Sequence, residues 1–200
     1  MHALVEETLR AGPLTIAVAR PADADALIDE ARFAEDEFMP YWAELWPSAL
    51  ALADAVAHRD LRGTRAVELG CGLGVPSVAA ALVGADALAT DWAPEALEAT
   101  RANAARNGVT VETLLVDWRQ PAPLLDQAPF DLVLCADVLY EPRNVDALLA
   151  LLPRLANEVL LAEPGRATAA AFFERLEPTW IVGRERDVTL LRLSAPARER

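Results

Sequence analysis

The chain contains no lysine, because all 18 of its basic residues are arginines. It therefore cannot be its own substrate in a modification of lysine side chains. Acidic residues outnumber basic ones by 31 to 18, which gives a formal net charge of −13. A surface of that sign repels phosphate backbones, so the composition argues against DNA or RNA as a partner and favours a cationic one.

Cysteine and long apolar runs are also scarce. Cys71 and Cys135 are too few for a secreted disulfide scaffold and lack the spacing of zinc ligands, so we expect reduced thiols in a cytoplasmic protein and no bound metal. No uncharged run reaches the roughly 18 residues of a membrane span. The first ten residues contain Glu6 and Glu7 instead of a basic flank followed by an apolar run, so the sequence predicts neither a membrane segment nor an export signal.

A glycine-rich turn between two apolar runs is the most informative pattern. Residues 65–69 predict a buried strand, and residues 75–83 predict a helix that covers it. Glycines between them allow positive φ values and a close approach of the backbone to a ligand, while the helix N-terminus offers free N–H groups. The turn reads Val67-Glu68-Leu69-Gly70-Cys71-Gly72-Leu73-Gly74.

The spacing of these glycines argues against a dinucleotide loop. The G-x-G-x-x-G fingerprint requires glycine five residues after Gly70, where this chain has Val75. Glu68, just before the turn, would repel a pyrophosphate but suits a ligand with an ammonium group, such as S-adenosylmethionine. A second apolar run ends at Asp91, whose carboxylate can accept hydrogen bonds from both hydroxyls of a ribose. The alternative is a strand-to-helix turn that binds nothing.

Strands and helices alternate from residue 65 onward. Four alternating units and a terminal hairpin predict an α/β fold: a doubly wound, mostly parallel seven-stranded sheet with a C-terminal antiparallel hairpin. We expect strands at 65–69, 87–90, 111–116, 132–136, 159–162, 180–186 and 188–193, and helices at 48–58, 75–83, 94–107, 145–156 and 167–176.

The N-terminal part is less regular than the rest. It contains a possible strand at 15–19 and an acidic, weakly helical segment at 21–37. We expect one domain across 1–200, in which 1–45 form an N-terminal extension, a candidate cover for the substrate side, and 46–200 form the catalytic core.

Polar and aromatic residues follow the predicted strands, where parallel sheets bind their ligands. Asp117 can accept from the exocyclic amine of adenine and Trp118 can stack on the purine, although turn capping and core packing are alternatives. Asp137 can attract an amine through a charge-assisted hydrogen bond, with Tyr140 as a wall of its channel. Here the alternatives are turn capping and packing against the next helix.

These motifs resemble the seven-stranded, class I S-adenosylmethionine methyltransferases, and among them the protein-lysine methyltransferases related to the enzyme for the β subunit of electron-transfer flavoprotein. The resemblance covers roughly residues 40–195. Its narrower features are Trp46, the Asp117-Trp118 pair and the Asp137-x-x-Tyr140 combination, whereas the glycine turn is common to the superfamily. It is carried by Tyr41-Trp42-Ala43-Glu44-Leu45-Trp46-Pro47, the 67–74 turn, Asp91-Trp92, Val116-Asp117-Trp118 and Ala136-Asp137-Val138-Leu139-Tyr140.

The resemblance implies S-adenosylmethionine as cofactor and in-line methylation of a lysine amine on a protein with a cationic or lysine-bearing surface, with no metal. Two alternatives stay open: a small-molecule amine or nicotinamide-like N-methyltransferase, and a module that holds the cofactor without turnover. The oligomeric state is also open. Asp137 and Tyr140 are the predicted catalytic residues, and the predicted cofactor contacts are Trp46, Glu68, Gly70, Cys71, Gly72, Gly74, Asp91, Trp92, Asp117, Trp118 and Ala136.

Overall fold

The structure, a computed structural model, describes residues 3–28 and 39–193. Its larger sheet consists of β3 (Arg65–Leu69), β4 (Asp86–Asp91), β5 (Glu112–Leu115), β6 (Leu132–Ala136), β7 (Glu158–Ala162), β8 (Trp180–Glu185) and β9 (Val188–Leu193). The helices are α2 (Pro47–Ala57), α3 (Val75–Leu82), α4 (Pro94–Arg106), α5 (Ala122–Leu125), α6 (Pro142–Leu155) and α7 (Ala167–Arg175). No helix in the described ranges has the length and apolar character needed to cross a bilayer.

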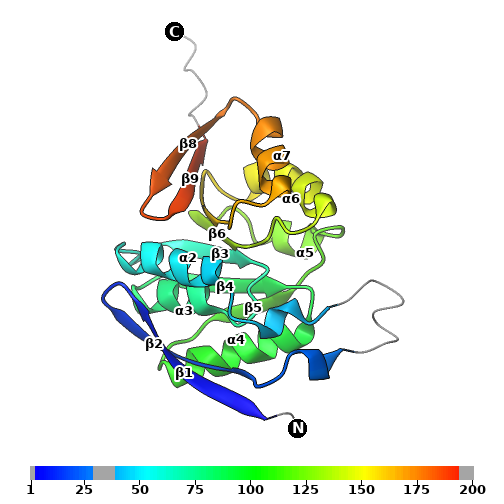
Figure 1. Cartoon of the computed structure of the whole chain (residues 1–200). Helices are drawn as coiled ribbons and strands as arrows, with labels where there is room; N and C mark the ends of the chain where they lie inside the picture. The colour runs from blue at the N-terminus through cyan, green and yellow to red at the C-terminus, as the bar shows by residue number, and fades with distance from the viewer. Residues whose placement is uncertain (1–2, 29–38, 194–200) are drawn as a thin grey trace.

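The strand order is β5-β4-β3-β6-β7-β9-β8, and only the β7–β9 and β9–β8 pairs are antiparallel. Helices flank the sheet, and the β8–β9 hairpin closes one end of it (Figure 1). This confirms the predicted doubly wound sheet with a C-terminal antiparallel hairpin. The helix α6 begins three residues before its predicted start. Proline fits the first turn of a helix because the N–H that it lacks has no partner there, so Pro142 can begin the helix. The short helix α5 was not predicted.

The central strands send alternate side chains into two apolar layers. On β3, Ala66 packs in the layer formed with α2, α3 and α4, whereas its neighbour Val67 packs in the layer formed with α5, α6 and α7. On β6, Leu134 and Cys135 divide between the same two layers. A sheet that is buried on both faces needs apolar residues on both, which is why these strands appear as continuous apolar runs in the sequence.

A separate hairpin of β1 (Leu4–Ala11) and β2 (Leu14–Pro21) packs against α2, α3 and α4. The predicted strand at 15–19 lies inside β2, while β1 was not predicted. The expected helix at 21–37 is wrong in its described part, because residues 22–28 contain only a 3-10 turn at Asp25–Leu27. The Asp23 carboxylate accepts the backbone N–H of Asp25 and Ala26, a local bond that favours a turn. Residues 29–37 lie outside the described part.

The side on which new strands join the sheet changes between β3 and β6, which are parallel neighbours. β4 and β5 extend the sheet on one side of β3, and β6 and β7 extend it on the other. The loops that follow β3 and β6 therefore turn to opposite faces, which leaves a crevice at the carboxyl ends of these two strands. Doubly wound sheets bind their ligands at this position.

Gly74 ends the glycine turn in the left-handed conformation (φ +74°), and a Cβ added there would lie 2.5 Å from Thr100 Cγ2 on α4. Gly63 has a similar φ of +77°, but a Cβ there would meet nothing within 4 Å. We expect Gly63→Ala to lower the free energy of unfolding by about 1 kcal/mol and Gly74→Ala by about 2–3 kcal/mol, since the second adds a clash to the backbone strain. Urea unfolding measures both, and equal losses would contradict the close packing on α4.

Candidate functional site

A cavity of about 480 Å³ lies at the carboxyl ends of the central strands. Its walls come from the loops after β3, β4, β5, β6 and β7 and from residues 39–49. Pockets for small ligands commonly have volumes of roughly 300–1,000 Å³. The predicted site residues that line the cavity are Trp46, Glu68, Gly70, Cys71, Gly72, Asp91, Trp92, Asp117, Trp118, Ala136, Asp137 and Tyr140.

Gly74 is the predicted site residue that does not line the cavity. It is buried, its N–H donates to the carbonyl of Cys71, and its open side faces Thr100. Gly70 has a different setting, because a Cβ there would lie 3.3 Å from Val138 Cγ1 and 3.7 Å from Trp118 Cζ2. The absence of a side chain at Gly70 therefore allows Trp118 and the loop after β6 to approach the turn.

Asp91 lies in the cavity wall and bonds the backbone of the two loops beside it. The residue is 6% exposed, and its carboxylate accepts the N–H of Gly72 and the N–H of Ala93, each at 3.0 Å. Burial raises the pKa of Asp91, while these N–H donors act in the opposite direction. Each carboxylate oxygen can accept a second hydrogen bond, so the residue still has acceptors for a diol. This pair of acceptor oxygens fits the hydroxyls of a ribose.

Glu68 has a partner that the sequence did not suggest. Its carboxylate accepts the N–H of Ser77 at 2.9 Å and the Ser77 hydroxyl, so it binds the first turn of α3. Burial, with a smaller contribution from the charge of Asp91, raises the pKa of Glu68 to about 8. In the protein without ligand the carboxyl is therefore mostly protonated at neutral pH, and the predicted contact with a ligand ammonium stays a prediction.

The raised pKa of Glu68 predicts a pH-dependent stability. Between about pH 4.5 and 8 the folded protein holds a proton on Glu68 that the unfolded chain has released, so its stability falls as pH rises through this window. The free energy of unfolding of the wild type should therefore fall from pH 5 to pH 8 by more than that of the Glu68→Gln variant. The difference between the two proteins should grow by no more than about 1.4 kcal/mol per pH unit. Urea unfolding across this range measures it, and parallel curves for the two proteins would exclude the linkage.

Aromatic rings connect residues 39–46 to the loop after β6. The Tyr41 ring lies edge-on to Trp46, with centroids 6.1 Å apart, and edge-on to Tyr140 at 5.6 Å. The indole N–H of Trp46 donates to the carbonyl of Tyr41 at 2.9 Å. Burial, and then the charges of Glu141 and Asp91, raise the pKa of Tyr140 to about 12, so its phenol stays protonated at physiological pH.

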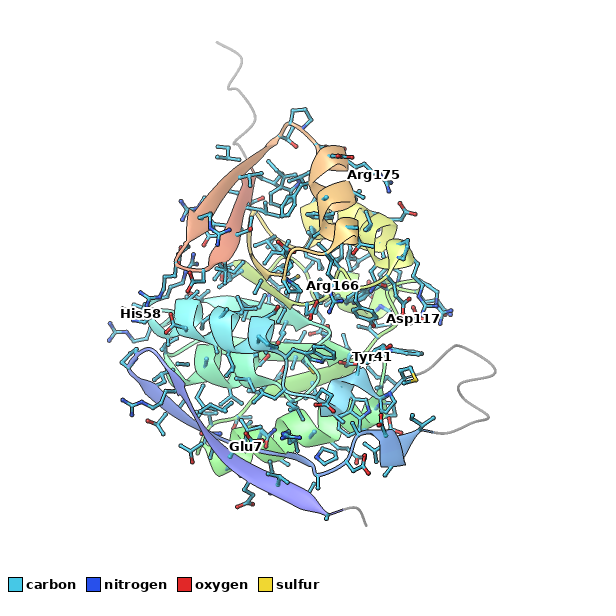
Figure 2. The ribbon with its side chains drawn as sticks, in the orientation of Figure 1. Glu7, Tyr41, His58, Asp117, Arg166 and Arg175 are labelled. Carbon is cyan, nitrogen blue, oxygen red and sulfur yellow. The ribbon has the colours of Figure 1, made fainter. Side chains whose placement is uncertain are left out.

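Asp137 forms an ion pair with Arg166, a residue that the sequence reasoning missed. Asp137 follows β6 with φ +54° and is 7% exposed, and its carboxylate accepts Nε and Nη2 of Arg166 at 2.7 and 2.9 Å. Arg166 comes from the loop after β7 and lines the same cavity as Tyr41 and Asp117, all three of which are labelled in Figure 2. Its position after a predicted strand was the signal that could have identified it.

Asp117 and Trp118 both line the cavity, but the Asp117 carboxylate is bonded to a neighbouring residue, whereas Trp118 packs beside the glycine turn. The Asp117 carboxylate accepts the N–H of Arg119 at 2.8 Å and Nε of Arg119 at 2.7 Å, and these bonds lower its pKa. This matches the turn-capping alternative, while the adenine contact stays a prediction. Trp118 is half-buried in the cavity wall, beside Gly70.

The two cysteines are buried and free. Burial raises the pKa of both thiols, which disfavours the nucleophilic thiolate form. Within residues 3–28 and 39–193 no group of three or more His, Cys, Asp or Glu residues has an arrangement that could hold a metal ion.

Comparison with known proteins identifies the family. The family model described as lysine methyltransferase matches residues 29–178. The chain belongs to the lysine methyltransferase family. The fold and the family confirm the resemblance that the sequence motifs predicted, and with it S-adenosylmethionine as the cofactor.

Two relatives of this lysine methyltransferase family member come from Xenopus laevis. The histone-arginine methyltransferase METTL23 is 32% identical over 129 residues, 62% of this chain and 55% of the relative. The electron transfer flavoprotein beta subunit lysine methyltransferase is 34% identical over 137 residues, 64% of this chain and 54% of the relative. The chain thus spans about half the length of these curated relatives.

A solved structure supports the fold. The 16S rRNA N2 G1207 methyltransferase of T. thermophilus, in complex with AdoMet and guanosine, superimposes with a TM-score of 0.67 at 16% identity. The match covers 96% of this chain and 51% of the other. At this identity the likeness establishes a shared methyltransferase fold.

Proposed function

We propose that the protein transfers a methyl group from S-adenosylmethionine to the ε-amine of a lysine in a protein substrate. The observation that carries the proposal is that one cavity is lined by two sets of residues. The nucleoside set consists of Gly70, Gly72, Asp91, Trp92 and Trp118, and the acceptor set consists of Tyr41, Asp137, Tyr140 and Arg166. The first suits a nucleoside cofactor, and the second suits an amine.

The nucleoside set would hold the cofactor through a few directed contacts. Asp91 offers the ribose hydroxyls the lone pairs that Gly72 and Ala93 leave open. Trp92 and Trp118 provide aromatic faces for a base, and Trp46 provides an indole face for a sulfonium by cation–π attraction. Asp117 and Ala136 complete this part of the lining, and Asp117 has an exposed side that can accept from an exocyclic amine.

The acceptor set would orient the amine. Arg166 holds the Asp137 carboxylate in place with two hydrogen bonds, and each carboxylate oxygen can still accept from an amine N–H. The rings of Tyr41 and Tyr140, which contact each other edge-on, form part of the wall beside this carboxylate. Because the phenol of Tyr140 stays protonated, it can serve as a hydrogen-bonding wall and not as a base.

The main task of the chain's residues would be to align the amine nitrogen with the methyl group and the sulfur of the cofactor. When bound, S-adenosylmethionine supplies a methyl group on a sulfonium, and the N–C bond forms as the S–C bond breaks. A lysine ε-ammonium has an ordinary pKa of about 10.4 and must first lose a proton from Nζ, which a desolvating aromatic cavity favours. We assign that proton to water, while Asp137 holds the neutral amine in line with the methyl group.

A protein substrate is favoured by the relatives and by charge. The names of both Xenopus relatives state a protein acceptor. The net charge of −13 attracts basic surfaces. We propose lysine and not arginine as the acceptor because the matching family is that of lysine methyltransferases, although one relative is a histone-arginine methyltransferase.

The proposal is tested by incubating the purified protein with methyl-tritiated S-adenosylmethionine and a lysate from its own source. Labelled protein bands are excised and hydrolysed, and their methylated amino acids are separated. Because the chain has no lysine, labelled methyl-lysine cannot come from a side chain of the enzyme itself. Methyl-lysine in a protein band supports the proposal.

Three other results would contradict it in different ways. Labelled methyl-arginine would assign the acceptor to arginine. Label in small molecules alone would identify an amine or nicotinamide-like N-methyltransferase. Measurable binding of the cofactor without transfer in any fraction would identify a binding module.

A further inference from the structure

Two asparagines on α4 bind the backbone of β2. Asn107 Oδ1 accepts the N–H of Ala17 at 2.9 Å, and its Nδ2 donates to the carbonyl of Ala17 at 2.7 Å. One helical turn earlier, Asn103 Oδ1 accepts the N–H of Ala19 at 2.8 Å, and its Nδ2 donates to the carbonyl of Ala19 at 3.2 Å. The two side chains therefore pair with the edge of β2 that faces away from β1, as a neighbouring strand would.

The two side chains differ in their third hydrogen bond, because Nδ2 of Asn107 donates to the carbonyl of Asn103 within α4 at 2.8 Å, whereas the third bond of Asn103 leaves the helix. The second N–H of its Nδ2 donates to the carbonyl of Leu73 in the glycine turn at 3.0 Å. The residue is 1% exposed, and this bond completes the hydrogen-bonding capacity of its amide nitrogen. Asn103 thus joins the N-terminal hairpin to the turn that carries Gly70 and Gly72.

α4 supports the same turn at a second point. The hydroxyl of Thr100 lies 3.1 Å from the carbonyl of Gly72 and donates to it, and Thr100 packs directly under Gly74. Thr100 and Asn103 are three residues apart and lie on one face of the helix. Two side chains of α4 therefore bond the backbone carbonyls of the turn, while Asp91 accepts the N–H of Gly72 in the same turn.

We infer that Asn103 is a positioning residue for the cofactor turn and couples the docking of the β1–β2 hairpin to the binding of S-adenosylmethionine. Asparagine is a poor helix former, and a buried amide is costly unless all of its groups are bonded. Because the Asn103 amide bonds both the hairpin and the turn, the position of the turn is more stable when the hairpin is docked, and the docked hairpin is more stable when the turn is ordered. By linkage, ordering of the turn by the cofactor must also strengthen the docking of the hairpin. The coupling concerns the cofactor half of the proposed function and does not depend on the methyl acceptor.

The test compares Asn103→Ala with Asn107→Ala, since both remove a pair of bonds to β2 and only the first removes the bond to the turn. Hydrogen exchange of the unliganded proteins is measured at the Gly72 and Gly74 amides, which are bonded to Asp91 and Cys71. We expect Asn103→Ala to accelerate exchange in the turn and to raise the Kd for S-adenosylmethionine about tenfold, while Asn107→Ala changes the Kd less than about twofold. Calorimetric titration gives both Kd values.

A measurement on the wild type keeps the test independent of variant folding. Saturation with S-adenosylmethionine should slow exchange at the Ala17 and Ala19 amides, which lie on the hairpin and outside the cavity lining. Equal changes in the turn for both variants, or an unchanged hairpin on cofactor binding, would overturn the inference. If the wild type failed to bind the cofactor while Asn103→Ala alone loosened the turn, the positioning role would stand and the proposed function would fail.

Discussion

Replacement of Asp137 by asparagine is expected to lower kcat for methyl transfer by a factor of about 10²–10³, with the Kd for S-adenosylmethionine changed less than about twofold. Asparagine tolerates the left-handed conformation that Asp137 adopts, so the backbone after β6 should be preserved. The variant loses the negative charge that holds Arg166 and the second anionic oxygen that would orient an amine. Initial rates at saturating cofactor, with the substrate identified from the lysate, measure the effect.

Asp146→Asn is the matched control for this variant. It makes the same substitution and also removes the partner of an arginine, Arg175, but this pair lies on the exposed surface of α6 and α7, away from the cavity. Its kcat should match that of the wild type. An Asp137→Asn protein with wild-type kcat would show that Asp137 serves the fold through Arg166 and has no part in aligning the acceptor.

Replacement of Asp91 by asparagine is expected to raise the Kd for S-adenosylmethionine about 100-fold. Asparagine offers one acceptor oxygen in place of two and would direct its amide N–H₂ toward the N–H of Gly72 or of Ala93. Loss of a charged partner in two hydrogen bonds is commonly worth about 1.5–3 kcal/mol for each bond, part of which relaxation of the turn recovers. Calorimetric titration of the purified variant measures the change.

Asp86→Asn provides the control, because Asp86 is exposed at the opposite end of the same strand. It should bind the cofactor with wild-type affinity. Burial raises the pKa of Asp91, so its charge is not itself a source of stability, and we expect Asp91→Asn to remain folded in a thermal unfolding scan. A folded Asp91→Asn protein with unchanged affinity would remove Asp91 from the site.

Most of the sheet could be predicted from the sequence because its strands are buried on both faces. The apolar runs at 65–69 and 132–136 match β3 and β6, and Asp91 lies at the strand end where it was expected. β1 could not be predicted in this way, since most of its residues are exposed and leave no apolar run. Its position depends on β2, and that of β2 on Asn103 and Asn107, more than 80 residues later in the chain.

The site was predicted less completely for a related reason. Residues that follow strands converge on one edge of the sheet, so position alone brought Asp91, Asp137 and Trp118 into one set. Ion pairs between loops leave no local pattern in the sequence. Arg166 is one of 18 arginines, and although its position after a predicted strand could have marked it as a candidate, the side-chain geometry identified its partner, a carboxylate 29 residues earlier.

The tryptophans of this chain are distributed unevenly, which has a practical consequence. Trp42, Trp46, Trp92 and Trp118 all line the cavity, and the remaining one, Trp180, is buried in the apolar layer with α6 and α7. Four of the five indoles of the protein therefore lie at the site. Occupation of the cavity should change the intrinsic fluorescence strongly, so ligands can be screened optically on the unlabelled wild type, with Trp180 as a constant internal background.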